Sequence, residues 1–131
     1  IDKIKKTVLF LLNDNDAVLV RVIKNKFKKD AGWESIISSN FNETVILFEQ
    51  SKPDVVLTEI ILEDEKGRTG FDFITEIKTK ENIRKAQIII FTELGQNDDK
   101  EKAKNLDVKY FFTKSEVTIN ELIDQIKNIV N

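Results

Sequence analysis

The chain has 131 residues and a formal net charge of -2, and it contains no cysteine and no histidine. This composition excludes disulfides, thiol catalysis, histidine metal ligands and histidine general bases, and it gives no global field that would recruit nucleic acid or an anionic membrane. The apolar runs are far shorter than the roughly 20 residues that cross a bilayer. We therefore expect a single domain over residues 1–131, with its core at about 7–130 and a cytoplasmic location by default.

Short apolar runs alternate with amphipathic stretches along the whole chain. The predicted strands are Thr7–Leu12, Trp33–Ser38, Val55–Glu59, Gln87–Thr92 and Lys109–Thr113. Apolar residues at helical spacing, with capping residues at several of the starts, predict helices over Asp16–Lys29, Asn40–Gln50, Phe71–Lys80, Asn97–Leu106 and Thr118–Val130. Five strand–helix units in series indicate a parallel sheet with helices on both faces.

Polar residues stand where four of the predicted strands end. Asp14 follows the first strand, Glu59 and Thr92 end the third and fourth strands, and Lys114 follows the fifth. In open α/β sheets, ligands bind beyond the carboxyl ends of the strands. Carboxylates, a hydroxyl and an ammonium at that edge predict a site that handles phosphate.

The residues Leu12-Asn13-Asp14, Pro53-Asp54 with Glu59, Gly70-Phe71, Phe91-Thr92 and Lys114 stand in an order that resembles the receiver domain of two-component response regulators. The resemblance covers nearly the whole chain. It implies a doubly wound, flavodoxin-like (βα)5 fold with strand order 2-1-3-4-5. It also implies a signalling module rather than an enzyme, in which a histidine kinase phosphorylates an aspartate at the end of the third strand.

The resemblance also assigns roles to particular residues of this chain. Glu59 occupies the phosphoacceptor position, Thr92 and Lys114 the positions that contact the phosphoryl oxygens, and Phe111 that of an aromatic switch residue. The implied Mg²⁺ ligands are Asn13, Asp14, Glu59 and the backbone carbonyl of Ile61.

Two of these positions depart from the pattern of the family. Asn13 replaces an acid, so we expect the Mg²⁺ site to be weak or lost. Glu59 is longer than an aspartate by one methylene, about 1.5 Å, which places its oxygens where a phosphoryl group would sit. We hypothesise that Glu59 replaces the phospho-aspartate and reaches toward Thr92 and Lys114. A domain locked without a switch, or weak phosphorylation at Glu59 or at a loop acid, are the alternatives within the family.

The expected partners are other signalling proteins, with a histidine kinase or a phosphotransfer protein among the candidates. The resemblance suggests that they bind the face formed by Asn97–Leu106, Lys109–Thr113 and the last helix. A competing hypothesis from another class is a small Mg²⁺-dependent phosphotransferase or phosphatase that uses Asp14 of Asp14-Asn15-Asp16 as its nucleophile. The chain is short for such an enzyme.

Overall fold

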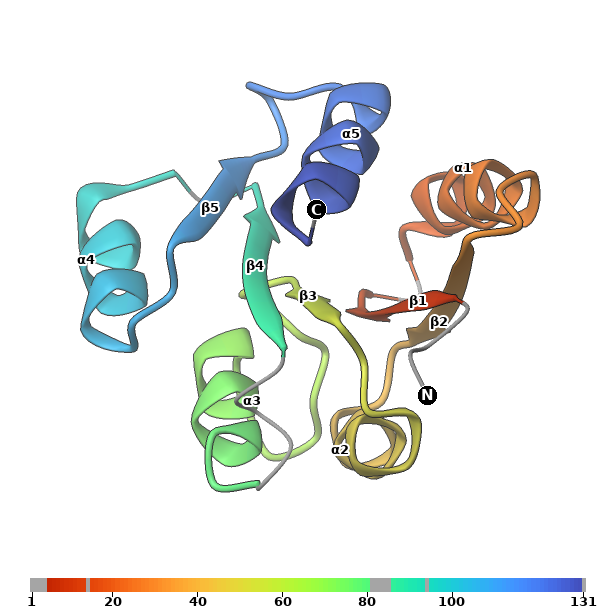
Figure 1. Ribbon diagram of the computed structural model, residues 1–131. Helices are drawn as coiled ribbons and strands as arrows, with labels where there is room; N and C mark the ends of the chain where they lie inside the picture. The colour runs from red at the N-terminus through yellow and green to blue at the C-terminus, as the bar shows by residue number, and fades with distance from the viewer. Residues whose placement is uncertain (1–4, 14, 81–85, 94, 131) are drawn as a thin grey trace.

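The computed structural model describes residues 5–13, 15–80, 86–93 and 95–130 (Figure 1). Within these residues, five strands form one parallel sheet in the order β2-β1-β3-β4-β5. The strands are β1 (Lys6–Leu11), β2 (Trp33–Ser38), β3 (Val55–Thr58), β4 (Gln87–Thr92) and β5 (Tyr110–Thr113). The helices are α1 (Ala17–Lys28), α2 (Phe41–Ser51), α3 (Gly70–Ile77), α4 (Asn97–Asn105) and α5 (Ile119–Ile129). The predicted doubly wound α/β fold and its strand order are confirmed.

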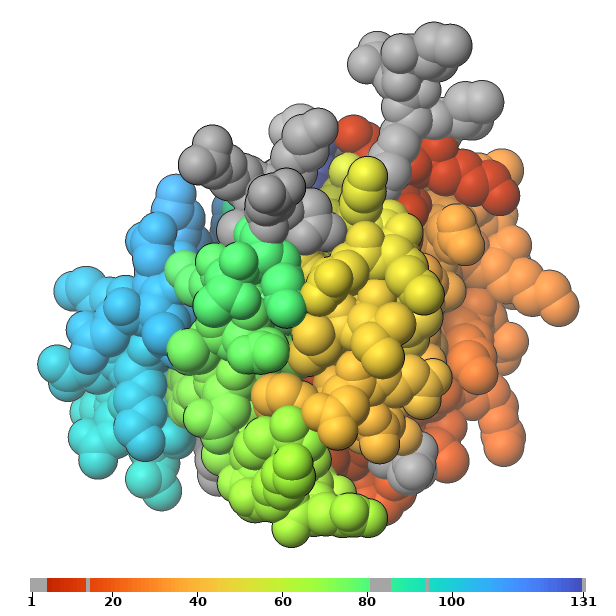
Figure 2. Space-filling view, turned by 90° about the horizontal axis from the view of Figure 1, so that it is seen from below, coloured from red at the N-terminus to blue at the C-terminus, as the bar shows by residue number. Residues whose placement is uncertain are grey.

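The helices form two layers, one on each face of the sheet (Figure 1). α1 and α5 pack on one face and α2, α3 and α4 on the other, and α2 and α3 lie side by side on the face shown in Figure 2. Because successive side chains of a strand point to opposite faces, β1 sends Val8 and Phe10 into the first layer and Leu9 and Leu11 into the second. The central strands are therefore buried on both sides, which explains their uninterrupted apolar sequence.

The register of the sheet brings the strand ends together. Leu11 pairs with Thr58, Thr58 with Ile90, and Thr92 with Thr113. The segments that follow β1, β3, β4 and β5 thus leave the sheet at the same edge, which is where the sequence predicts the site.

The helices agree with the predicted ranges except at their ends. α3 ends at Ile77, earlier than the predicted Lys80, and α1 buries Leu19, Ile23 and Phe27. α4 buries a single residue, Ala103. Across the described ranges, none of the helices has both the length and the hydrophobicity needed to cross a lipid bilayer.

Candidate functional site at the carboxyl edge of the sheet

The backbone fixes Glu59 at the first position beyond β3. Its N–H donates to the carbonyl of Leu11 at 3.0 Å, and its own carbonyl accepts the hydroxyl of Thr58 at 2.9 Å. A Cβ atom at Gly70 would lie only 2.0 Å from that carbonyl oxygen, so a residue without a side chain is needed where α3 starts against β3. These contacts hold Glu59, which is only 4% exposed, at the end of a central strand.

Lys114 provides the positive charge for this buried carboxylate. Its Nζ lies 2.6 Å from Oε2 of Glu59 and 3.0 Å from Oδ2 of Asp16. Its backbone N–H donates to the carbonyl of Thr92 at 2.8 Å, which ties the segment after β5 to the end of β4. Burial by itself lowers the pKa of Lys114, but hydrogen bonds to Glu59 and Asp16 outweigh it, so the pKa lies above its ordinary value of 10.5. The ammonium is therefore charged at neutral pH and compensates Glu59.

Two side-chain bridges connect the loop after β1 to the loop after β3. Nδ2 of Asn13 donates to the carbonyl of Ile61 at 2.7 Å, and Nδ2 of Asn15 donates to Oε1 of Glu63 at 3.0 Å. Both bridges join residues 48 positions apart in the sequence. The two loops that border the site are thus held together by amide side chains.

The described donors fit a Mg²⁺ site poorly. The Ile61 carbonyl, an implied ligand, accepts the amide of Asn13, and the carboxylate of Glu59 is held by an ammonium. In the described part of the chain, no three acidic side chains are grouped in a way that would hold a metal ion. Asp14, the remaining implied ligand and the nucleophile of the phosphatase hypothesis, lies outside the described residues.

A cavity of about 360 Å³ opens above these residues, lined by Asn13, Asn15, Asp16, Glu59, Ile61, Glu63, Thr92, Glu93 and Lys114. Four of these side chains are carboxylates and one is an ammonium. Since the single ammonium is already paired with two of the carboxylates, the lining disfavours a phosphate dianion and any other anionic ligand.

The structure thus gathers most of the predicted site residues around one cavity. Asn13, Glu59, Ile61, Thr92 and Lys114 all line it. Phe111 lies on β5, where it is partly buried against the core layer of α2, α3 and α4.

Two further lining residues are Asp16, which the sequence linked to a site only through the Asp14-Asn15-Asp16 motif of the phosphatase hypothesis, and Glu63, to which it gave no role in this site. Asp16 pairs with a lysine 98 residues away, and Glu63 pairs with Asn15 across two loops. No local sequence pattern predicts such contacts, because an acid just before a helix is normally interpreted as a capping residue.

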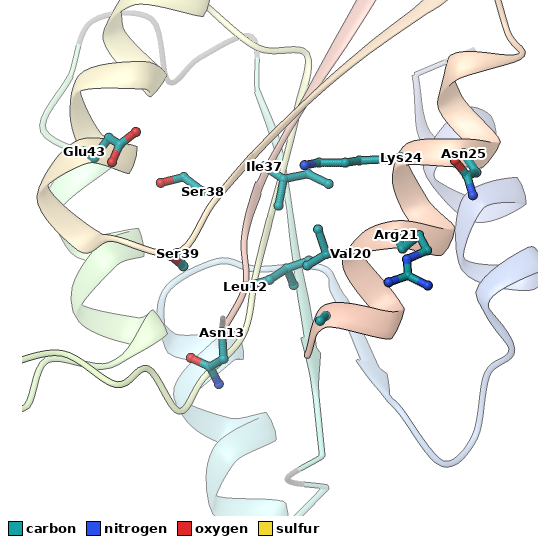
Figure 3. A pocket seen from close by; sticks show the side chains of 11 residues that line it. Leu12, Asn13, Val20, Arg21, Lys24, Asn25, Ile37, Ser38, Ser39 and Glu43 are labelled. Atoms are coloured by element: carbon teal, nitrogen blue, oxygen red, sulfur yellow. The ribbon is translucent and has the colours of Figure 1, made fainter. Parts of the chain in front are cut away.

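A second groove of about 540 Å³ lies beside this site, between α1 and the end of β2 (Figure 3). It is lined by side chains of α1, including Arg21 and Lys24, and by Ser38 and Ser39. In Figure 3, Lys24 extends toward Ile37 whereas Arg21 points in a different direction. The two cations do not converge on one point, so the groove lacks the focused polar groups of a specific anion site.

The doubly wound sheet, with an acid–lysine pair where its strands end, places the protein in the class of flavodoxin-like α/β proteins whose site lies at the carboxyl edge. Within that class, the chain belongs to the response regulator receiver domain family, whose sequence pattern matches residues 10–127. It is therefore a receiver domain of a two-component signalling system, a signalling module rather than a classical enzyme. Receiver domains in general interact with kinases and other signalling proteins.

Solved structures of other response regulators resemble this chain closely in fold. A DNA-binding response regulator of the LuxR family from Staphylococcus aureus is 25% identical, with a TM-score of 0.74 over 96% of this chain and 99% of the other. A CheY-like receiver domain protein from Methanospirillum hungatei JF-1 reaches 0.80 at 17% identity, over 96% and 94% of the two chains. Chemotaxis protein CheY4 of Vibrio cholerae reaches 0.78 at 16% identity, over 95% and 98%.

Proposed function

We propose that this receiver domain is atypical, with Glu59 in the place of a phosphorylated aspartate and with output through protein–protein contacts. The observation that supports the proposal is the 2.6 Å ion pair between Glu59 and Lys114. The family resemblance gives Lys114 the role of contacting a phosphoryl group. In this chain, Lys114 is already paired with a carboxylate of the domain itself, that of Glu59.

The length of Glu59 and the charge around it both disfavour phosphorylation. In-line phosphoryl transfer requires the attacking oxygen to be placed to a fraction of an ångström, and the extra methylene displaces it. The acidic lining of the cavity opposes the approach of an anionic phosphodonor. Weak Mg²⁺ binding completes the proposal, since Asn13 is neutral and donates to the Ile61 carbonyl.

The proposed output surface is the face formed by α4, β5 and α5. α4 buries only Ala103, so few apolar contacts oppose a shift of this helix. Lys114 lies between β5 and α5 and forms the ion pair with Glu59. A change in the contact between Glu59 and Lys114 would therefore act directly on the segment that joins β5 to α5, at the face where we expect a partner protein to bind.

NMR spectra of Glu59→Gln and Glu59→Asp test the proposal. If Glu59 sets the state of the domain, both variants shift the amide signals of Thr92, Phe111 and Lys114, because each changes the contact with the ammonium. Glu49→Gln is the matched control, since Glu49 pairs with Lys80 at 3.0 Å on the surface. Spectra around Thr92 and Phe111 that match those of the unsubstituted chain would refute the role of Glu59.

Intact-mass analysis after incubation with Mg²⁺ and acetyl phosphate gives an independent test. We expect no stable gain of a phosphoryl group by the unsubstituted chain, and a greater gain by Glu59→Asp, whose shorter carboxylate restores the length of the usual acceptor. Stoichiometric, stable phosphorylation of the unsubstituted chain would contradict the proposal.

A further inference from the structure

Asp16 stands at the N-cap of α1 but does not cap it. Aspartate is favoured there because its carboxylate accepts a backbone N–H from the first turn of the helix. The side chains at the starts of α2, α3 and α5 make such bonds, from Asn40, Thr69 and Thr118. The carboxylate of Asp16 makes none, and the first turn of α1 contains no other acid.

The carboxylate of Asp16 is used instead at the site. Its Oδ2 accepts a hydrogen bond from Nζ of Lys114 at 3.0 Å, across 98 residues of sequence. The two side chains are only 33% and 18% exposed, so the pair is partly withdrawn from water. A residue that departs from its local preference in favour of a distant contact is a candidate for a functional role.

We infer that Asp16 is a positioning residue, which holds the ammonium of Lys114 in place against Glu59 from the start of α1. An ammonium has three equivalent donors on a long flexible chain, so one acceptor alone does not fix its direction. A second carboxylate, carried by a helix that packs on the sheet, defines where the ammonium lies. The inference rests on the proposed function, because the placement of Lys114 matters there only if its pair with Glu59 sets the state of the domain.

The experiment measures how firmly Lys114 is held, by NMR of its side chain in the ¹⁵N-labelled chain. We expect Asp16→Asn to accelerate hydrogen exchange of the Lys114 ammonium by about tenfold, in keeping with the loss of one charge-assisted hydrogen bond. The two Hε protons of Lys114 give a second readout, since they differ in shift only while the side chain is fixed in one rotamer. Asp16→Glu keeps the carboxylate, so we expect the Lys114 ammonium of this variant to exchange more slowly than that of Asp16→Asn.

The asparagine variant separates positioning from capping. Asparagine caps helices about as well as aspartate, so a purely structural role in α1 predicts no change at Lys114. The matched control is Asp30→Asn, because Asp30 holds Lys127 by a similar pair at 2.6 Å between the end of α1 and α5. This control is expected to release Lys127 and to leave Lys114 unchanged.

Unaltered exchange and unaltered Hε shifts of Lys114 in Asp16→Asn would overturn the inference. This outcome is distinct from failure of the proposed function, which shows in Glu59→Gln at Thr92 and Phe111. Release of Lys114 by Asp16→Asn supports the positioning role even if Glu59→Gln leaves those signals unchanged.

Discussion

At the scale of single residues, burial decides which ion pair matters. Lys80 and Glu49 form a pair in which the glutamate is 52% exposed, and such pairs contribute about 0–1 kcal/mol. The Glu59 side chain is only 5% exposed. Removing one partner of a buried pair costs about 3–5 kcal/mol, because the other charge is left uncompensated. Of these two pairs, Glu59–Lys114 is therefore the one whose loss the domain tolerates less.

Gly70→Ala is expected to destabilise the protein although alanine is the better helix former. Alanine gains about 1 kcal/mol over glycine inside a helix, but a Cβ at this position would meet the Glu59 carbonyl oxygen at 2.0 Å. Overpacking of this kind typically costs about 1–3 kcal/mol, and here the atom that must move is backbone. We expect a lower free energy of unfolding in urea and shifted amide signals at Glu59.

Gly32→Ala is the control for this substitution. The added methyl group would lie 3.3 Å from a side-chain oxygen of Asp30, which is able to move. A free energy of unfolding for Gly70→Ala equal to that of the control would mean that the close approach of α3 to β3 is not a constraint.

At the scale of elements, the loop between β3 and α3 is organised by one ion pair. Arg68 donates to both carboxylate oxygens of Asp64, at 2.8 and 2.9 Å, and its Nη1 donates to Asn42 at 3.0 Å. Its guanidinium also stacks on the ring of Phe41, 3.9 Å from the centroid. Asp64 further accepts the backbone N–H groups of Lys66 and Arg68. The loop that carries Ile61 and Glu63 past the site is thus fastened to the start of α2.

This loop is expected to loosen only in strong acid. Hydrogen bonds from the Arg68 side chain hold the pKa of Asp64 well below its ordinary value of 3.8. A lowered folded pKa means that the stabilisation is fully present above pH 3.8 and is lost as the pH falls through the folded pKa. The side-chain Nε–H signal of Arg68 should therefore persist through pH 3.8 in an NMR titration.

Asp64→Asn provides the comparison for the titration. This variant should lose the protected Arg68 signal already at neutral pH, because the charged acceptor is gone. An Asp64 carboxyl that titrates at 3.8 in the folded chain would show that the pair does not organise the loop.

At the scale of the whole molecule, one sheet separates two core layers that, among the described residues, are built from different side chains. Ile23 of α1 belongs to one layer and Ile74 of α3 to the other, and both are fully buried. Both layers nevertheless pack on the same central strands, so we expect them to unfold in one cooperative transition.

Ile23→Val and Ile74→Val are expected to act independently on stability. Each removes one buried methyl group and should lower the free energy of unfolding by about 0.5–1.5 kcal/mol. Because the residues lie on opposite faces, the double variant should match the sum within about 0.5 kcal/mol in urea unfolding. Val18→Ala, at a position 74% exposed, serves as the control with little effect. A clear departure from the sum would mean that the sheet transmits strain between the layers.

The alternation of strands and helices was predictable because the sequence patterns that indicate it are short and recur along the chain. Each central strand is an apolar run that ends at a polar residue, and the strand–helix alternation leaves few topologies once crossovers are right-handed. The same logic placed Glu59, Thr92 and Lys114 at one edge. The helix boundaries did not follow from the same signals, since α3 ends at Ile77 although the predicted range runs to Lys80.

The amino-acid sequence by itself determined the parallel sheet and the edge where the acid and the ammonium meet, because hydrophobic periodicity and chain connectivity can be read from short stretches of sequence. The strand order followed from the resemblance to receiver domains. Only the tertiary structure decided that Asp16 shares Lys114 with Glu59, and that Asn13 and Asn15 bridge two loops. These contacts join residues 48 to 98 positions apart. Their geometry depends on how helices and loops pack over the sheet, which no short stretch of sequence specifies.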